Sequence, residues 1–280
     1  MTVALVTDST SSLTAKEAKA AKIDIVSLQV VIGADVYTEG KDVTADMVSE
    51  ALATYVPVST SRPTPDDFSA AYERAAKTGA TEIVSVHLSS KMSGTFDSAL
   101  LAAKSASIPV TCVDTGQVGI ATGYASLRAA AVRDDGGSAK AVAAAARNAG
   151  QNSYILFYVD TLEYLKRGGR VGTAAALIGS ALAVKPLLTV RDGLIAPLEK
   201  VRTAAKAIAR LEALVVERAA TFEDGFDIGV QHLSNPSVAK SVADRLGNAL
   251  DVEDVTIREV GASIGAHVGP GMIAVNLTPR

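Results

Sequence analysis

Hydroxyl side chains are concentrated in residues 89–95, where the sequence is Ser-Ser-Lys-Met-Ser-Gly-Thr. This stretch follows a short apolar run and opens a helical pattern. Free backbone N–H groups and the dipole at a helix start favour an anion, and the hydroxyls of Ser93 and Thr95 can add donors. The same residue types also serve as ordinary helix N-caps, so an anion site and a cap are both open here.

A second hydroxyl-rich stretch covers residues 59–66, with the sequence Ser-Thr-Ser-Arg-Pro-Thr-Pro-Asp. It also precedes a helical pattern, which predicts a loop that offers Thr60 and Ser61 as further hydrogen-bond donors. The alternative is a helix cap in which proline sets the turn.

Residues 261–271 contain four glycines and one proline, which predicts a loop. Glycine lets a backbone approach a ligand closely, so His267 within this loop is a candidate ligand contact. A lone histidine is more often structural or on the surface, and that interpretation also stays open.

Basic residues are unevenly distributed along the second half of the chain. Residues 161–210 contain nine Lys or Arg and three acidic residues, whereas residues 211–280 contain five and ten. This excess fits either ordinary variation on solvated helices or a basic face for an acidic partner or a phosphate group. Arg170 ends a Gly-Gly-Arg stretch in this segment, which is either a phosphate contact or a plain basic turn.

Several kinds of catalytic or cofactor site are excluded by the motifs that are missing. The sequence has no Gly-x-x-x-x-Gly-Lys-Ser/Thr phosphate loop and no Gly-x-Gly-x-x-Gly after a strand, so it shows no means of binding ATP unaided. Its three histidines and one cysteine show no metal-ligand spacing, and we expect neither a metal nor a cofactor. Cys112, inside an apolar run, is predicted to be a buried, inert thiol.

Ser263 lies in a Gly-Ala-Ser-Ile-Gly stretch that matches the nucleophile elbow of hydrolases. That pattern requires an acid and then a histidine downstream. No Asp or Glu follows Ser263, and His267 is only four residues away, which favours a glycine-rich turn. A serine-dependent lipid hydrolase or acyltransferase remains the alternative function, although its only candidate bases, His267 and His87, have no evident orienting acid.

The elements that must position these side chains alternate in the first half of the chain. Short apolar runs end in small polar residues at 3–6, 83–88 and 110–113, and alanine-rich helical patterns cover 66–77 and 96–106. Alternating strands and helices predict a parallel, doubly wound sheet, in which ligands bind beyond the carboxyl ends of the strands.

The second half has a different pattern, which predicts an α+β domain with a mostly antiparallel sheet. A hairpin is expected where two apolar runs flank Arg191-Asp192-Gly193. The predicted strands are 154–159, 184–190, 194–201, 228–233, 255–260 and 272–277. A boundary at residues 150–153, after a helix at 139–149, divides the chain into domains 1–150 and 151–280. A further hairpin at 25–37 cannot be assigned to either domain.

The composition constrains the core and the partners. The 280 residues fit one large domain or two of ordinary size, and the 4% aromatic content predicts an aliphatic core or cavity. A net charge of −3 gives no reason to expect nucleic acid as a partner. The N-terminus resembles a first strand rather than a signal peptide, and no run approaches the ~18 apolar residues of a membrane span.

Taken together, these segments resemble the DegV family over essentially the whole chain. The resemblance rests on short motifs in the same order along the sequence: 6–10 (Val-Thr-Asp-Ser-Thr), 60–63 (Thr-Ser-Arg-Pro), 88–90 (Leu-Ser-Ser), 93–95 (Ser-Gly-Thr), 165–170 (Leu-Lys-Arg-Gly-Gly-Arg), 185–186 (Lys-Pro), 200–202 (Lys-Val-Arg) and 265–271 (Gly-Ala-His-Val-Gly-Pro-Gly).

The resemblance implies a cytoplasmic two-domain protein that encloses a long-chain fatty acid and is not itself an enzyme. Such proteins act as the binding subunit of bacterial fatty acid kinase, whose separate catalytic subunit makes an acyl phosphate for phospholipid synthesis. By the same resemblance, the carboxylate would be bound by Thr60, Ser93 and His267, with support from Ser61 and Thr95. Arg202 and Arg170 would contact the kinase.

The expected energetics divide the site into two parts. Removing a sixteen-carbon chain from water gains roughly 12 kcal/mol, at ~0.8 kcal/mol for each buried methylene. Hydrogen bonds from hydroxyls contribute only ~0.5–1.5 kcal/mol each, and somewhat more to a charged group. We therefore expect a hydrocarbon tunnel to set the affinity and the polar residues to set the orientation. A protonated His267 would offset the cost of burying a carboxylate.

Overall fold

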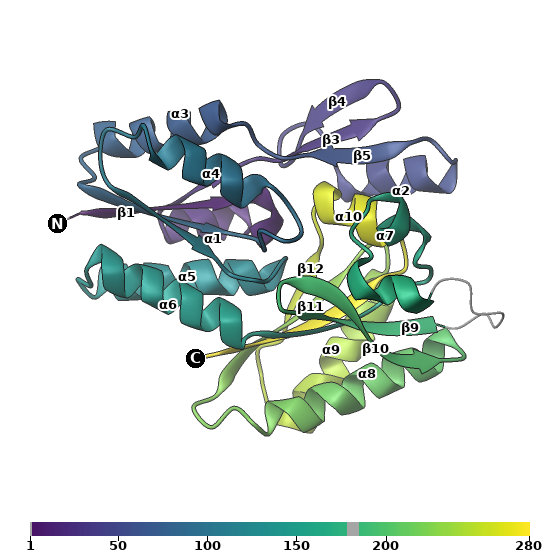
Figure 1. Cartoon of the computed structure of the whole chain (residues 1–280). Helices are drawn as coiled ribbons and strands as arrows, with labels where there is room; N and C mark the ends of the chain where they lie inside the picture. The colour runs from purple at the N-terminus through teal and green to yellow at the C-terminus, as the bar shows by residue number, and fades with distance from the viewer. Residues whose placement is uncertain (1, 178–184) are drawn as a thin grey trace.

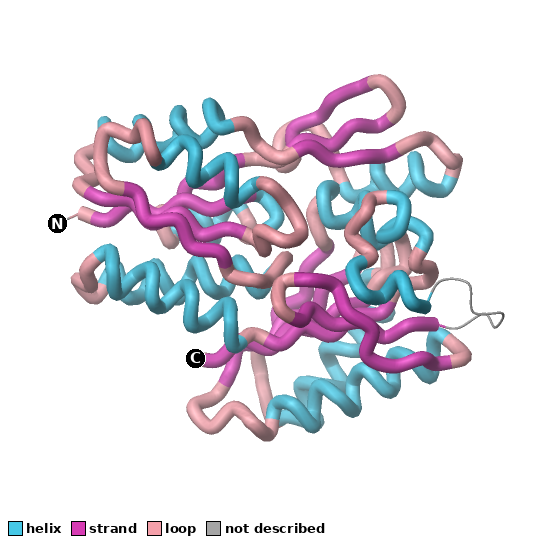
Figure 2. Tube along the Cα trace, in the orientation of Figure 1, coloured by secondary structure: helices cyan, strands magenta, loops and turns pink. Residues whose placement is uncertain are grey.

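The computed structural model describes residues 2–177 and 185–280 as a mixed α/β protein with three sheets (Figures 1 and 2). Figure 1 shows the first sheet and its helices around the N-terminus and the largest sheet around the C-terminus, with a small third sheet at the top. Among the described residues, no helix is both long and apolar enough to cross a membrane.

The first sheet has four parallel strands in the order β2-β1-β6-β7, which confirms the parallel sheet expected from the alternating pattern. Helices α3 and α4 pack on one face, and α5 and α6 pack on the other. The strands are β1 (Val3–Asp8), β2 (Ile23–Val26), β6 (Glu82–His87) and β7 (Val110–Asp114), and the helices are α1 (Ala15–Ala20), α3 (Pro65–Lys77), α4 (Thr95–Ala103), α5 (Ile120–Asp134) and α6 (Ala139–Asn152).

The largest sheet has the order β10-β9-β8-β13-β11-β12, and only its β11–β12 pair is parallel, as the mostly antiparallel prediction requires. The predicted hairpin is formed by β9 and β10, although Val184 lies outside the described residues. The elements are β8 (Tyr154–Tyr158), β9 (Lys185–Arg191), β10 (Leu194–Val201), α8 (Ala204–Ala219), β11 (Phe226–His232), α9 (Pro236–Leu250), β12 (Thr256–Glu259) and β13 (Ile273–Pro279).

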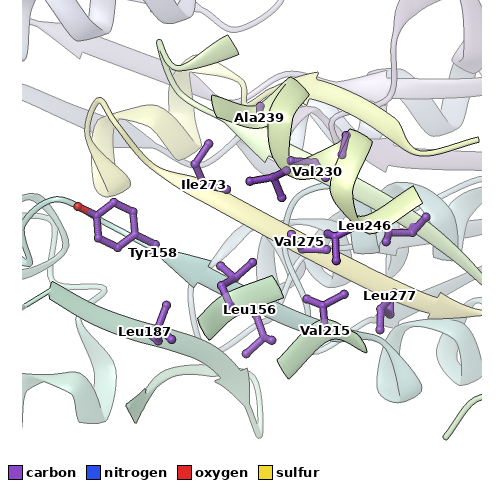
Figure 3. Packing of buried hydrophobic residues seen from close by; sticks show 14 of the residues in the cluster. Leu156, Tyr158, Leu187, Val215, Val230, Ala239, Leu246, Ile273, Val275 and Leu277 are labelled. Atoms are coloured by element: carbon purple, nitrogen blue, oxygen red, sulfur yellow. The ribbon is translucent and has the colours of Figure 1, made fainter. Parts of the chain in front are cut away.

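The two faces of this sheet bury different side chains. Figure 3 shows Leu156, Val230 and Val275 pointing from the strands into a core that is completed by residues of α8 and α9, such as Val215 and Leu246. Because side chains alternate along a strand, the residues between them point to the opposite face. That face is directed toward α5 and toward the cavity described below.

The third sheet consists of β3 (Gln29–Ile32), β4 (Asp35–Thr38) and β5 (Val58–Ser61), and it packs against α2 (Ala45–Ala53) and α10 (Ala262–Val268). The hairpin predicted at 25–37 is therefore β3–β4, but residues 25 and 26 belong to β2 of the first sheet. The predicted loop at 59–61 is wrong, because these residues pair with β3 as an edge strand. This sheet comes from the first half of the chain and contacts a helix from the second half.

Two further segments differ from their predictions. Helix α6 continues through Gly150 to Asn152, so the boundary expected at residue 150 falls within a helix. Gly150 packs so closely on Thr115 that an added Cβ would lie 2.7 Å from the Thr115 Cβ. Residues 262–268 form α10 rather than a loop. The division into domains 1–150 and 151–280 stays a prediction, and α5 and α6 lie between the first and largest sheets.

Candidate functional site

Three side chains from distant parts of the sequence meet at one cavity. Thr60 comes from β5, Ser93 from the loop between β6 and α4, and His267 from the last turn of α10. The Thr60 Oγ1 and His267 Nε2 atoms lie 2.8 Å apart and share a hydrogen bond. All three residues line the same cavity, together with aliphatic side chains such as Leu165 and Ile264.

Thr60 and Ser93, the candidate residues of the two hydroxyl-rich stretches, do not cap the helices that follow them. Helix α3 is capped by Thr64, whose hydroxyl accepts from the Asp67 N–H at 3.2 Å, so Thr60 has no capping role. Helix α4 begins after Gly94 without a side-chain cap. Ser93 Oγ instead lies 2.9 Å from Thr95 Oγ1, which is fully buried. Thr60 and Ser93 are therefore available to a ligand.

Ser61 is not brought to the cavity. It follows Thr60 in β5, so the two side chains point to opposite faces of the sheet. Thr60 faces α10 and His267, whereas Ser61 is exposed. In this arrangement, Ser61 makes no contact at the cavity that would give it the expected supporting role.

His267 is held in an environment that disfavours its charged form. Burial, with a smaller contribution from repulsion by the nearby Arg170 guanidinium, lowers the pKa of His267 to about 4. Nδ1 of His267 is buried and has no hydrogen-bond partner within the described part of the chain. The imidazole is therefore neutral at pH 7 in this structure, and a protonated His267 beside a buried carboxylate stays a prediction for the ligand-bound protein.

Arg170 lines the same cavity instead of lying only at an outer surface. Its Nε donates to the Met92 carbonyl at 3.0 Å, and its Nη1 donates to the Gly168 carbonyl at 2.6 Å. These bonds place a guanidinium beside Ser93 and His267. Arg202 is exposed between β10 and α8 and does not line the cavity. Contact with the kinase is expected of both residues, but the structure places Arg170 at the cavity and Arg202 at the surface.

Replacing Gly168 with alanine is expected to displace the His267 ring, because the added Cβ would lie 2.1 Å from Nδ1. The helical φ of Gly168 suits alanine, so the effect is steric. A displaced, more hydrated imidazole should titrate nearer the ordinary histidine value of about 6.5. An NMR titration of the His267 ring protons measures this change.

The matched control is Gly169→Ala. Gly169 has φ +71° and no atom within 4 Å of the added Cβ, so alanine there strains the backbone without touching His267. It should lower stability by about 1–2 kcal/mol and leave the His267 titration unchanged. Equal titration shifts in both variants would contradict the proposed steric contact.

A second cavity adjoins the first. The two have Val118, Ile195, Ile264 and Val268 in common as lining residues, so they lie next to each other. The second cavity is lined mainly by aliphatic side chains from α10 and the largest sheet, with Phe157 as its one aromatic residue among those described. This agrees with the aliphatic cavity expected from composition. The individual residues carried no recognisable motif, because only their inward direction distinguishes them from other core residues.

A serine, a histidine and an aspartate are hydrogen-bonded in series at a different place, in the first sheet. Nε2 of His87 lies 2.7 Å from Ser85 Oγ, and Nδ1 lies 2.9 Å from Asp8 Oδ2. The sequence alone shows no acid that could orient His87, but in the structure Asp8 has this position. All three side chains are fully buried, and Ser85 Oγ accepts from Tyr72 at 3.0 Å inside the core. A substrate has no access to this arrangement, which fits a structural role.

Ser263 lies in the first turn of α10, after the strand β12, and the predicted glycine-rich turn is therefore wrong. Its backbone N–H donates to Glu39 Oε1 at 2.8 Å, and burial raises the pKa of the Glu39 carboxyl. His267 follows one turn later, but its Nε2 is bonded to Thr60. Among the described residues, no histidine is hydrogen-bonded to the Ser263 hydroxyl, so it lacks the base that activates a serine nucleophile.

The remaining candidate reactive groups give no second site. Cys112 is a free, half-buried thiol whose pKa burial raises to about 11. Such a thiol is a poor nucleophile near neutral pH. Within residues 2–177 and 185–280, no three histidine, cysteine or carboxylate side chains are grouped as metal ligands.

Comparison with known proteins identifies the architecture. The model of the DegV family matches residues 2–280. The chain is 48% identical over 281 residues to a DegV domain-containing protein of Streptomyces coelicolor, with 99% of each chain covered. It also resembles the crystal structure of DegV, a fatty acid binding protein from Bacillus subtilis, with TM-score 0.92, 31% identity and all of both chains covered. A DegV family protein from Thermus thermophilus, described for its fatty acid binding, gives TM-score 0.91, 30% identity and the same coverage.

Proposed function

The chain belongs to the DegV family, and from this premise we propose that it binds a long-chain fatty acid and presents it to a separate ATP-dependent fatty acid kinase for acyl phosphate formation. The carboxylate would lie at Thr60, Ser93 and His267. The observation that carries the proposal is a set of polar side chains in one cavity that adjoins a second, mainly aliphatic cavity.

The polar end suits a carboxylate because it combines donors with a positive charge. Thr60 and Ser93 offer hydroxyls, and His267 offers a ring nitrogen. Thr95 supports Ser93 through their 2.9 Å contact. The Arg170 guanidinium adds a cation, which offsets part of the cost of moving a carboxylate out of water. This charge comes from arginine, since His267 is neutral before the ligand binds.

The aliphatic end suits a hydrocarbon chain. Val118, Ile195, Ile264 and Val268 line both cavities, and a chain anchored at Ser93 and His267 would extend past them into the second cavity. Burial at ~0.8 kcal/mol for each methylene exceeds what the few polar contacts contribute. Affinity would therefore come mainly from the hydrocarbon chain.

The proposed kinase partner accounts for features that fatty acid binding leaves unexplained. The chain has none of the phosphate-binding motifs that would let it use ATP itself. The basic segment 161–210 contains the exposed Arg202, which suits contact with an acidic surface. We place this reaction in the cytoplasm, with this protein as the non-catalytic, substrate-carrying subunit. Arg170 would then lie where the carboxylate meets the kinase.

The alternative of a serine-dependent lipid hydrolase or acyltransferase is less well supported by the geometry. Ser85 has a suitable histidine but is fully buried, and Ser263 is close to the cavity but has no bonded histidine. Turnover of a fatty acyl ester by the isolated protein would favour this alternative.

The first test is mass spectrometry of the organic extract from denatured protein purified from a bacterial host. We expect one long-chain fatty acid for each chain. In binding assays with palmitate, Thr60→Val should lower the affinity about 10- to 100-fold, because it removes a hydrogen bond to a charged group. Ser61→Ala, one residue along and exposed, should change it less than threefold. A protein that is empty after purification and ignores both palmitate and oleate would refute the proposal.

A further inference from the structure

Beyond Ala274, the side of β13 that faces the second cavity becomes polar. Strand β13 starts near the end of α10 and runs away from it; Ala274 lines the cavity, as does Met272 just before the strand. The next residue on the same face is Asn276, which is 2% exposed. Directly across from Asn276 in β8 is Ile155, which lines the cavity. Opposed side chains on one face of antiparallel strands lie about 4.5–5.5 Å apart, so Asn276 is next to the cavity wall.

Asn276 belongs to a buried polar cluster in which two side-chain oxygens have no donor among the described residues. Its Nδ2 donates to Thr278 Oγ1 at 2.8 Å, and Thr278 Oγ1 lies 2.8 Å from Ser153 Oγ. Gln117 Nε2 donates to the Ser153 carbonyl at 3.3 Å. The side-chain oxygens of Asn276 and Gln117 are both buried and have no donor among residues 2–177 and 185–280.

The neighbouring part of the cavity wall includes the polar side chain of Gln231, which two hydrogen bonds hold in place. Gln231 is opposite Ala274 and lines the cavity. Its Oε1 accepts from the Ile120 N–H at 3.0 Å, and its Nε2 donates to Ser12 Oγ at 3.1 Å. Both ends of the amide are therefore occupied, and the side chain cannot swing aside without breaking bonds.

Close packing fills the space beside Asn276 on the side of β11. Gly229 lies opposite Asn276 in β11, and a Cβ added there would be 2.8 Å from Ile120 Cδ1. The Ile120 side chain thus rests directly on the Gly229 backbone. A chain that reaches this point meets Asn276 and Gln231 rather than further aliphatic surface.

We propose that Asn276 determines the longest acyl chain that the protein binds, by ending the aliphatic cavity with unsatisfied acceptors. This inference rests on the proposed fatty acid binding. Each methylene buried in the aliphatic part strengthens binding about fourfold, which corresponds to ~0.8 kcal/mol. A methylene pressed against the Asn276 oxygen gains little, because it seals this polar group away from any donor. Affinity should therefore rise with chain length and then stop rising.

The experiment measures the affinities of saturated fatty acids from myristate to docosanoate for the wild type and for Asn276→Leu. Leucine has nearly the shape of asparagine without its polar atoms. We expect the break in the chain-length series to move to longer acids, with the affinity for eicosanoate relative to palmitate rising about tenfold. Palmitate affinity itself should stay within about threefold of wild type.

The control is Thr278→Val, a change of similar shape in the same hydrogen-bonded cluster but two residues beyond Asn276. It should leave the break where it is in the wild type. If Asn276→Leu does not fold, Asn276→Ala replaces it, and the same shift toward longer acids is expected.

The outcomes separate this inference from the proposed function. A wild type that binds none of the acids refutes fatty acid binding itself. A wild type that binds them, with the same break in the folded Asn276 variants or an equal shift in Thr278→Val, refutes only the role of Asn276.

Discussion

Replacing Asp8 with alanine is expected to lower the free energy of unfolding by about 3–5 kcal/mol, the largest stability loss that we expect from a single substitution. The Asp8 carboxylate accepts from the Thr10 N–H at 3.1 Å, the Leu88 N–H at 3.2 Å and His87 Nδ1 at 2.9 Å. All of these groups are buried, so alanine would leave several donors without an acceptor. Denaturant unfolding followed by circular dichroism measures the loss.

Asp24→Ala is the matched control, because Asp24 lies beside Val6 in the same sheet and also has a basic partner, Arg74. Both of these charged side chains are largely exposed, and such surface pairs contribute about 0–1 kcal/mol. Asp8→Asn keeps one acceptor oxygen and should fall between the two. Equal losses in Asp8→Ala and Asp24→Ala would show that the buried hydrogen bonds do not stabilise the first sheet.

The ligand-free protein is expected to lose about 3 kcal/mol of stability through His267 alone as the pH falls from 7 to 4. The unfolded chain takes up a proton on this residue near its ordinary pKa of 6.5, whereas the folded chain does so only near the lowered pKa of about 4. Between these values the unfolded state binds more protons, so acid favours it. Stability is retained above pH 6.5 and falls through this window. Unfolding measured at several pH values for the wild type and His267→Gln isolates the contribution, and parallel curves would contradict it.

The same histidine should couple fatty acid binding to proton uptake. A carboxylate beside His267 raises its pKa, because an opposite charge favours the protonated ring. Affinity for palmitate should therefore increase as the pH falls toward the ligand-free pKa of about 4, while His267→Gln removes this dependence. Calorimetry in buffers of different ionisation enthalpy detects the protons taken up. His232→Gln is the control, since His232 also has a lowered pKa but does not line either cavity.

Local patterns were sufficient to predict most strands. The apolar runs at 3–6, 83–88 and 110–113 are strands because strands of a parallel sheet are covered on both faces and need continuous apolar sequence. The Arg191-Asp192-Gly193 turn was recognisable because a left-handed backbone there suits glycine, and Gly193 has φ +76°. The hydroxyl-rich stretches were recognisable by residue type alone. These features depend on interactions between near neighbours in the sequence.

Local patterns gave a wrong secondary structure at residues 261–271 and 59–61. Four glycines indicated a loop, but α10 forms where Glu39, far away in the sequence, accepts the Ser263 N–H. Glycine 261 leaves room for that carboxylate, because an added Cβ would lie 2.3 Å from Glu39 Oε1. Residues 59–61 likewise form a strand only because β3 is beside them. A helix or edge strand this short has too little local stability to be visible without its tertiary partners.

The sequence by itself determined the family, the kinds of element in each half and the residue types at the polar site. Only the tertiary structure decided which of two adjacent hydroxyls, Thr60 or Ser61, reaches His267, a partner 207 positions away. It also decided that Arg170 faces the cavity and that His267 is neutral. The physical reason is that residue type and periodicity are local properties. The direction of a side chain, its burial and hence its pKa depend on strands and helices that meet only after the chain has folded.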